Sequence, residues 1–506
     1  MLEHPTIDAV WIGLDLGTQS CRALAVDDGG VTIAHAARPL HGHRDHNRHE
    51  QDPRAWWTAA ADALAIVTAK IGTRPVGGVA VCATSGTVLL TGLDGTPRTP
   101  GLMYDDARAG ALAGEAQDAG ADLWLKLGYR IQPAWALPKL LWWRDQGLLT
   151  GDVRLAHQPD VVAAALTGHA VESDSSHALK TGYDQLDRCW PQAVLERLRL
   201  DPAVLPPVVP PGTTLGVVCH DAAERTGLPV GTPVVAGMTD GCAAQLGAGA
   251  LVPGEWNSVL GTTLALKGVS TTLLHDPTGA VYSHRAPYGD LWLPGGASSS
   301  GAGAVKSLFP GADLAILTTA AAEVAEVPLC YPLTGRGERF PFVAPQAQGF
   351  LGNGALDRPG TGTGAARAFA AVCTGVAHVE RLCFDVLRGA GADVAGPISF
   401  TGGGSRNPWW NQLRCDVLGV PVRLPDDPEP ARGMAVLAAG AAGGDIPAAA
   451  RRLVRVRDTL EPDLARGAAL APGYDAFVTA LADRAWLDPD VANQARQRNL
   501  IRFADR

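Results

Sequence analysis

Short apolar runs separated by turn-forming residues dominate the first forty positions of the chain. Residues 9–14, 22–26 and 31–34 are mainly apolar, whereas Asp15–Ser20 and Asp27–Gly30 between them are rich in Asp, Gly and Ser. Runs of this length joined by turn signals predict strands that pair with their neighbours in sequence. We therefore expect an antiparallel β-meander at the start of the chain.

A helix and a further strand are predicted to follow the meander. Asp52 can cap the helix, Pro53 suits its first position, and apolar residues recur at helical spacing from Trp56 to Val67. The apolar run 78–83 then predicts a strand, which ends at the turn-forming sequence Thr84-Ser-Gly-Thr87.

The unit of strand, Gly-Thr turn and strand occurs a second time, about 245 residues further along the chain. Residues 233–236 predict a strand, and a helix follows from Asp240. Strands at 256–260 and 264–268 then flank the turn Gly261-Thr-Thr263. Two strand–turn–strand units can arise by coincidence in a Gly-rich chain, but two related α/β domains explain the order better. We expect these domains to face each other, each contributing one turn to a shared cleft.

The remaining pattern places the domain boundaries. The elements expected in the C-terminal half are a helix at 364–387, a strand at 397–400, a glycine loop at 401–405 and a small-residue helix at 433–442. With a hinge near 245–252, the expected domains are 1–248 and 249–480. Residues 481–506 are charged and predict a peripheral tail.

Composition narrows the class of protein. The 506 residues are 46% apolar, enough for a buried core, and 42 Lys and Arg against 51 Asp and Glu give a net charge of −9. This balance argues against nucleic-acid binding, and the longest apolar runs are too short to span a membrane. Met1–Thr6 lacks the pattern of a signal peptide, and nine cysteines without a Cys-x-x-Cys pair favour the cytoplasm.

The turn Asp15–Ser20 is the first candidate for chemistry. Its glycine lets backbone N–H groups approach a phosphate, Thr18 and Ser20 add hydroxyl donors, and Asp15 can hold Mg²⁺ through water. Alone, the turn is equally well explained as an ordinary hairpin. The second turn, Gly261–Thr263, favours a nucleotide site, because two such turns can hold its β- and γ-phosphates.

Asp240 is the candidate proton acceptor. Between a predicted strand and a predicted helix, its carboxylate can accept a hydroxyl proton while that oxygen attacks phosphorus. The competing interpretation is an ordinary helix N-cap, but the position of Asp240 just ahead of the second turn favours catalysis.

The loop Gly402–Asn407 has no bulky side chains and can admit the adenine and ribose of a nucleotide, with Asn407 as a hydrogen-bonding group. A flexible turn is the alternative interpretation.

Other motifs are set aside. Gly296–Gly301 has the glycine spacing of a P-loop, but Ala302 replaces the lysine; Gly352–Asp357 fails as a dinucleotide fingerprint at its last glycine. The histidines at positions 41, 43, 46 and 49 could bind zinc, but a solvated loop is favoured because no cysteine or fixed ligand pair supports the metal.

An ordered set of short motifs spans the chain from about residue 10 to about residue 480. In order, they are Asp15-x-Gly-Thr-x-Ser20, His49-Glu-Gln-Asp-Pro53 before Trp56-Trp57, Tyr104-Asp-Asp-Ala-Arg108, Leu166-Thr-Gly168, Gly237-x-x-Asp240, Gly261-Thr262 and Gly402-Gly-Gly-Ser-Arg-Asn407. As an ordered whole they resemble the FGGY carbohydrate kinases. The resemblance implies an α/β fold of two ribonuclease-H-like (actin/hexokinase-type) domains facing an interdomain cleft. It also implies ATP, Mg²⁺ and phosphoryl transfer to a sugar or polyol.

The resemblance also implies roles for individual residues. Asp240 matches the catalytic base, and Asp15 matches a substrate and metal contact. Ser85 and Tyr104 match substrate contacts, Tyr104 standing where the family often has a Trp. The expected nucleotide-binding residues are Gly17, Thr18, Gln19, Ser20, Gly261, Thr262, Thr263, Gly303, Gly403, Gly404 and Asn407.

Two stretches narrow the expected substrate. Xylulokinases have Met-His-Gly where this chain has Thr84-Ser-Gly86, so a serine replaces the sugar-contacting histidine. Asp174–Asp184 and Gly337–Val343 are similar to a group that contains D-ribulose kinases, in which a serine at the position of Ser85 helps to hold the sugar.

We therefore expect an ATP-dependent ketopentose kinase that makes D-ribulose 5-phosphate. The alternatives are a kinase for D-xylulose or another pentulose or pentitol, and a non-catalytic ATP-binding protein of the actin–chaperone type. The expected partners are the sugar and ATP alone, with the protein acting as a monomer or homodimer.

Overall fold

The computed structural model describes residues 9–276, 278–358 and 362–504, and the chain forms two compact units. Unit 1 comprises Met1–Leu251, His284–Trp292 and Asp427–Arg455. Unit 2 comprises Val252–Ser283, Leu293–Asp426 and Val456–Arg506. The stretch Met1–Thr6, which was expected not to be a signal peptide, lies outside the described residues.

The main sheet of unit 1 contains the predicted meander. In spatial order its strands are β12 (Thr214–Val217), β13 (Pro233–Val235), β6 (Val76–Ala83), β1 (Val10–Leu16), β2 (Ser20–Asp27) and β3 (Thr32–Pro39). Strands β1, β2 and β3 pair antiparallel, as expected, and β6 lies parallel to β1. In this register Asp15 of β1 lies beside Arg22 of β2 and Cys82 of β6.

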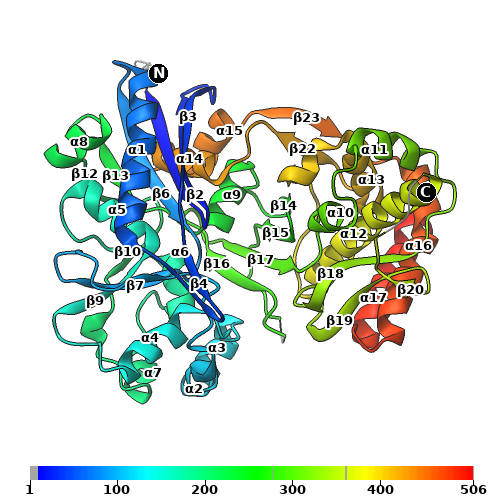
Figure 1. The fold of residues 1–506 in the computed structure, drawn as a ribbon, viewed down its shortest axis with the longest axis horizontal. Coiled ribbons are helices and arrows are strands. Elements are labelled where there is room, and N and C mark those ends of the chain that lie inside the picture. Colours follow the sequence, from blue (N-terminus) through cyan, green and yellow to red (C-terminus); the bar gives the residue numbers. More distant parts are fainter. Residues whose placement is uncertain (1–8, 277, 359–361, 505–506) are drawn as a thin grey trace. The chain divides into compact units, whose positions relative to one another are not determined.

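Helices pack against this sheet in two groups (Figure 1). The first comprises α1 (Pro53–Ile71), α5 (Gln158–Thr167) and α8 (His220–Thr226), and the second comprises α9 (Asp240–Gly247), α14 (Pro430–Gly443) and α15 (Ile446–Leu453). The Asp52 carboxylate accepts a hydrogen bond of 3.0 Å from the Arg54 N–H, which confirms the predicted cap of α1. Alternate β1 residues, among them Ile12 and Leu14, join Trp56 and Leu64 of α1 in one core.

The opposite face of β1 approaches α14 closely because both elements carry glycine. A Cβ atom built on Gly13 would lie 1.7 Å from the Ala431 carbonyl oxygen. Helix α14 approaches α9 in the same way, since a Cβ on Gly433 would lie 1.8 Å from the Ala243 carbonyl oxygen. The predicted small-residue helix therefore holds together the two elements that carry Asp15 and Asp240.

Unit 1 also contains a smaller region. Its sheet has the order β4 (His43–Asp45), β5 (Arg48–Gln51), β8 (Gly101–Leu102), β7 (Val88–Gly92) and β9 (Val153–His157). The remaining elements of this unit are η1 (Gly110–Leu112), α2 (Ala113–Ala119), α3 (Ala121–Leu127), α4 (Ala136–Asp145), β10 (Ser173–Asp174), α6 (Ser175–Ala178), η2 (Leu179–Thr181), α7 (Gln192–Arg197), η3 (Pro202–Val204) and β11 (Val208–Val209).

Unit 2 repeats the central strand arrangement of unit 1. The order of its large sheet is β16 (Tyr282–Arg285), β17 (Trp292–Ser298), β15 (Leu264–Gly268), β14 (Trp256–Leu260), β21 (Ile398–Thr401), β22 (Val422–Pro425) and β23 (Val456–Leu460). Strand β14 pairs antiparallel with β15 and parallel with β21, as β1 does with β2 and β6. This correspondence confirms the predicted repetition of strand, Gly-Thr turn and strand.

The long helix α12 (Thr363–Gly389) forms the centre of the unit 2 core, where Phe384 meets Trp256 edge to face at 5.6 Å. The other helices of the unit are α10 (Gly303–Leu308), α11 (Leu314–Ala322), η4 (Gly403–Arg406), α13 (Pro408–Leu418), α16 (Leu464–Asp483) and α17 (Pro489–Ala504). Strands β18 (Cys330–Glu338), β19 (Ala344–Leu351) and β20 (Gly354–Ala355) form a separate sheet.

The compact units differ from the contiguous domains expected from the sequence in three places, the first of which is His284–Trp292, a segment of unit 1. Residues 427–455 belong to unit 1, because α14 packs on β1 and α9. The expected tail forms part of unit 2, since Leu487, Ala492 and Ala495 are buried in its core and α17 packs on α12 and α16.

None of the helices in the described part of the chain is long and apolar enough to cross a membrane. All nine cysteines are free thiols.

Gly13→Ala tests the close approach of α14 to β1. We expect unfolding to become easier by about 1–3 kcal/mol or more, because the new methyl group overlaps the α14 backbone. Gly114→Ala is the matched control, since Gly114 is an exposed helical position where an added Cβ meets no atom within 4 Å. Urea denaturation measures both, and equal stabilities for the two variants would contradict the packing argument.

Candidate active site

Asp15 lies near the end of β1, on the face of the sheet that approaches α14. Its side chain is almost fully buried, with the residue 6% exposed. The Cys82 sulfur lies 3.7 Å from Asp15 Oδ1, and the Arg22 guanidinium lies 3.9 Å from Oδ2. This carboxylate is therefore held by strand pairing and has one distant cation beside it.

Asp240 is the first residue of α9 and is half-buried. The cap position belongs to Thr239, whose N–H donates to Ser176 Oγ at 2.9 Å, so the N-cap interpretation of Asp240 does not hold. The Asp240 Oδ1 atom accepts a hydrogen bond of 2.8 Å from the N–H of Gly241. Asp240 thus begins a helix, with its carboxylate oriented by the backbone.

The two carboxylates influence each other. Burial, together with the negative charge of Asp240, raises the pKa of Asp15 to about 7 against the opposing effect of Arg22. Mg²⁺ is commonly held by one or two carboxylates, substrate phosphates and water. The described residues contain no group of three or more His, Cys, Asp or Glu side chains that could hold a metal. The pair Asp15 and Asp240 fits an ion that completes its shell from a phosphate ligand.

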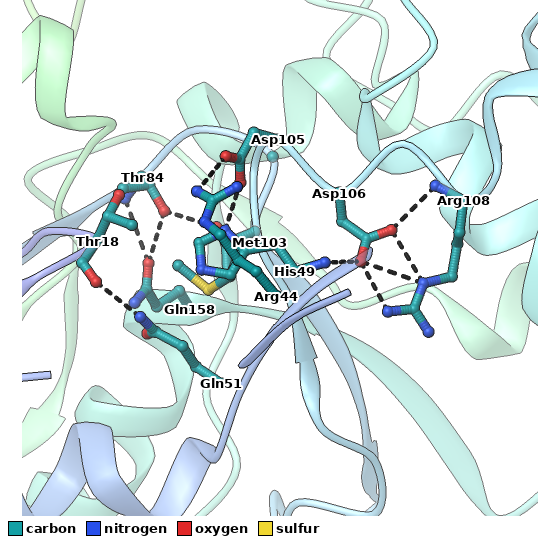
Figure 2. Close-up of polar contacts among 12 residues, drawn as sticks. Thr18, Arg44, His49, Gln51, Thr84, Met103, Asp105, Asp106, Arg108 and Gln158 are labelled. Atoms are coloured by element: carbon teal, nitrogen blue, oxygen red, sulfur yellow. Dashed lines mark hydrogen bonds and ion pairs between the residues drawn. The ribbon is translucent and has the colours of Figure 1, made fainter. Parts of the chain in front are cut away.

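The first Gly-Thr turn is tied to the rest of unit 1 through its backbone. Within the turn, the Gly17 N–H donates to the Ser20 carbonyl at 3.0 Å. The Gln51 Nε2 atom donates to the Thr18 carbonyl at 2.7 Å, and the Leu40 N–H donates to the Gln19 carbonyl at 2.8 Å (Figure 2 shows Gln51 and Thr18). Gln51 belongs to the His49–Pro53 motif, and its side chain thus holds a turn that is expected to bind phosphate.

The turn after β6 carries Ser85 and is held by two lysines. Lys180 Nζ donates to the Ser85 carbonyl at 3.0 Å, and Lys139 Nζ donates to the Gly86 carbonyl at 2.9 Å. Lys139 also donates to the Met103 carbonyl at 2.6 Å, next to Tyr104, which is 43% exposed. The Ser85 Oγ atom is buried and makes no hydrogen bond within the described part of the chain.

Sequence reasoning missed Lys139, although one signal pointed to it. It is the one charged residue between Trp135 and Trp142, in the apolar first part of α4, and it is fully buried. Burial lowers the pKa of the Lys139 ammonium group to about 7, while Asp106 opposes this shift. An amine with N–H groups directed at two carbonyls links the turn with Ser85 to the segment with Tyr104.

The segment Tyr104–Arg108 is fixed by its own carboxylates (Figure 2). The buried Asp106 accepts from the His49 N–H at 2.7 Å and from the guanidinium of Arg108 at 2.7–3.1 Å. Asp105 accepts from Arg44 and lies 2.6 Å from His49 Nδ1. His49 is 3% exposed and its ring is bound to a carboxylate, and His43 and His49 belong to strands β4 and β5 rather than to the solvated loop expected from the sequence.

The second Gly-Thr turn lies between β14 and β15. The Gly261 N–H donates to the Thr263 carbonyl at 3.0 Å. The next contacts come from the start of α10: the Ala302 N–H donates to the Gly261 carbonyl at 2.9 Å, and the Gly303 N–H donates to the Thr262 carbonyl at 3.1 Å. The Gly303 N–H, expected to contact nucleotide, is thus directed at the turn, and a Cβ there would lie 2.7 Å from Thr262 Cγ2.

Unit 2 contains a cavity of about 1000 Å³ that is lined mainly by apolar atoms. It is lined by Ala302, Val305, Lys306, Phe309, Pro310, Gly311, Ala312, Leu314, Ala315, Thr318, Thr319, Phe369, Gly403, Gly404, Arg406, Asn407, Pro408 and Trp410. The structure thus brings the predicted residues Gly403, Gly404 and Asn407 together. Asn407 caps α13 by accepting from the Trp410 N–H at 3.1 Å, and its Nδ2 donates to Thr318 Oγ1 at 2.8 Å.

The glycines of the 402–404 segment have different surroundings. Gly402 has a φ of +81°, which favours glycine, and a Cβ on Gly404 would lie 2.5 Å from Leu260. A Cβ on Gly403 would meet nothing within 4 Å. The segment is therefore packed closely on β14, with Gly403 open at the cavity wall. The apolar lining of this cavity suits a planar base.

Comparison with known proteins places these features in a family. Models of the FGGY family of carbohydrate kinases match residues 10–247 with the N-terminal domain and residues 257–442 with the C-terminal domain. Xylulose kinase of Streptomyces coelicolor is 31% identical over 453 residues, covering 87% of this chain and 90% of that protein. Xylulose kinase of Escherichia coli is 25% identical, covering 92% and 98%.

Solved structures agree with this match. The crystal structure of xylulose kinase from Rhodospirillum rubrum has a TM-score of 0.83 and 28% identity, covering 94% of this chain and 98% of that chain. Plasmodium falciparum glycerol kinase with ADP shares the fold, with a TM-score of 0.80 at 16% identity over 93% and 98% of the two chains. The chain therefore belongs to the FGGY family of carbohydrate kinases. It is a sugar kinase with two α/β domains of the actin/hexokinase type, as predicted.

The buried amine of Lys139 predicts a pH-dependent stability. Its pKa is about 7 in the folded protein and about 10.4 in the unfolded chain, so between these values the unfolded state binds more protons. The contribution of Lys139 to the free energy of unfolding should therefore rise from pH 7 to pH 10.

The measurement is urea denaturation of the wild type and Lys139→Met at several pH values. We expect the wild type to gain stability relative to this variant as the pH rises. Lys126→Met is the control at an exposed lysine, and its difference from the wild type should stay flat. A constant difference for both variants would show that Lys139 remains charged in the folded protein.

Proposed function

We propose that this protein transfers the γ-phosphoryl group of ATP to a pentulose, with D-xylulose as the first substrate to test. The pairing of Asp15 with Asp240 carries this proposal, because a proton acceptor beside a cation ligand suits phosphoryl transfer to a hydroxyl. Three of the relatives named above are xylulose kinases, and their match over most of the chain supports D-xylulose better than the expected D-ribulose.

In this proposal Asp240 accepts the proton of the sugar hydroxyl whose oxygen attacks the γ-phosphorus. The Gly241 N–H orients the carboxylate through its hydrogen bond to Oδ1. The helix N-terminus stabilises the ionised form of Asp240. Bound Mg²⁺ would neutralise charge on the phosphates, with Asp15 as its protein group.

Unit 2 supplies the nucleotide contacts in this proposal. The apolar cavity beside Gly403 would take the adenine, and the backbone of Gly261–Thr263 would contact the phosphates. The turn Gly17–Ser20 of unit 1 would hold the phosphate being transferred. Mg²⁺, a cytoplasmic location and a monomeric or homodimeric state stay predictions.

D-ribulose remains the second candidate substrate because of Ser85. Its Oγ atom is buried without a hydrogen bond in the described part of the chain, while its backbone is held by Lys180. A buried hydroxyl of this kind gains stability when a ligand hydroxyl completes its hydrogen bonding. Xylulokinases have a histidine where this chain has Ser85. Kinases for D-xylulose and for D-ribulose are therefore expected to differ at this sugar contact.

A non-catalytic ATP-binding protein is disfavoured by the Asp15 and Asp240 pair and by the sugar kinase family match. Release of ADP that depends on added sugar separates the two functions, because a sensor or assembly protein would hydrolyse ATP without sugar. A panel of pentuloses and polyols in a coupled ADP assay is the direct experiment.

Asp240→Asn tests the proton acceptor. We expect kcat with D-xylulose to fall by about 10²–10⁴-fold, because the amide keeps the size of the side chain but cannot take a proton. The dissociation constant of ADP should change little. Asp221→Asn, at an exposed position of α8, is the control and should retain wild-type turnover. Turnover near the wild-type value in Asp240→Asn would rule out its role as the base.

Ser85→His tests the choice of pentulose. We expect the ratio of kcat/KM for D-xylulose to that for D-ribulose to rise by about tenfold or more, since one well-placed hydrogen bond is worth about that factor. Ser85→Ala is the matched variant and should raise KM for the preferred sugar without favouring D-xylulose. An unchanged ratio in both variants would mean that Ser85 does not contact the sugar.

A further inference from the structure

Glu338, at the end of β18, is a buried carboxylate surrounded by hydrogen-bond donors. It is 3% exposed and belongs to the Gly337–Val343 stretch. Its Oε1 atom accepts from the N–H groups of Ser299 at 2.6 Å and Arg339 at 2.9 Å, and its Oε2 atom accepts from Ser298 Oγ at 2.9 Å, Tyr331 Oη at 2.7 Å and Ser300 Oγ at 3.4 Å. Within the described residues no Lys, Arg or His forms an ion pair with it.

Three of these five donors come from the single segment Ser298–Ser300. This segment leaves β17 inside the Gly296–Gly301 sequence, which has P-loop spacing without the lysine. A carboxylate that accepts several charge-assisted hydrogen bonds in a buried site holds its donors in one arrangement. Glu338 therefore fixes the backbone of the segment as well as its side chains.

The segment in turn holds the second Gly-Thr turn. The Ser300 carbonyl accepts from the Leu264 N–H at 2.8 Å, directly after the turn. The Ala302 and Gly303 N–H groups donate to the Gly261 and Thr262 carbonyls. Since a Cβ on Gly301 would lie 2.6 Å from the Thr262 carbonyl oxygen, the two backbones also touch. A continuous set of contacts thus runs from Glu338 to Gly261–Thr263.

We propose that Glu338 is a positioning residue for the phosphate groups of the bound nucleotide, acting through Ser298–Ser300 on the turn Gly261–Thr263. This inference rests on the proposed function, since it takes that turn as the phosphate contact. The proposal distinguishes the affinity for the base from the affinity for the phosphates. The apolar cavity of unit 2 binds the base without Glu338, whereas tight binding of the phosphates requires it.

Glu338→Gln tests this role by direct binding of AMP-PNP with Mg²⁺, and of adenosine, in the absence of sugar. The amide keeps the shape but places an NH₂ group among donors, so the segment must rearrange. We expect the dissociation constant of AMP-PNP to rise by about tenfold or more and that of adenosine to change by less than about twofold. Glu326→Gln, at an exposed glutamate of unit 2, should change neither.

A matched pair of variants keeps the test decisive if Glu338→Gln folds poorly. Ser298→Ala and Tyr331→Phe each remove one O–H donor from the same Oε2 atom, but only Ser298 belongs to the segment. We expect Ser298→Ala to weaken AMP-PNP binding selectively and Tyr331→Phe to leave it near the wild-type value. Equal losses for AMP-PNP and adenosine, or no selective loss in Ser298→Ala, would overturn the proposal.

These outcomes are distinct from failure of the proposed function. A wild-type protein that binds AMP-PNP but phosphorylates no pentulose would disprove the proposed reaction and leave the Glu338 inference standing on the binding data. A wild-type protein that does not bind AMP-PNP would disprove both. KM values for ATP and for the sugar give a further check, since only the former should rise in Ser298→Ala.

Discussion

The close approach of α14 to both β1 and α9 is the contact on which the unit 1 site depends. Gly13 and Gly433 let the helix backbone touch a strand on one side and a helix on the other. Backbone contact of this kind leaves little freedom for sliding, because packed interiors tolerate neither gaps nor overlaps of a methyl group. Asp15 and Asp240 stand on the elements held in this way, so packing keeps the two carboxylates in place, with Arg22 as a cation beside Asp15.

Three loops near the candidate site residues share a second structural feature. Each is tied by a polar side chain from a distant part of the sequence to its backbone: Gln51 binds the Thr18 carbonyl, Lys139 binds the Gly86 and Met103 carbonyls, and Glu338 binds the Ser299 N–H. Backbone groups of a loop need partners when they are buried. Supplying them from one side chain elsewhere in the sequence fixes the backbone of the loop.

Local signals account for the elements that the sequence predicts well. The Asp52–Pro53 start of α1 and the turns of the meander are decided by residues next to one another. Contacts between distant residues are different: nothing near Lys139 indicates that Gly86 and Met103 receive its N–H groups. The same holds for α14, whose small residues predicted close packing but not which sheet receives it. The position of Asp240 ahead of the second Gly-Thr turn predicts a site residue, and the family pattern agrees, whereas only the backbone geometry gives Thr239 as the cap of α9.

The assignment of residues 427–455 to unit 1 has a consequence for the order in which the chain folds. During synthesis the strands of the main sheet of unit 1 leave the ribosome long before α14, the helix that covers one face of β1. Until then that face of the sheet lacks its cover, and exposed apolar surface in an unfinished domain invites aggregation. Residues 427–455 therefore complete the first unit only after most of the second unit has been synthesised.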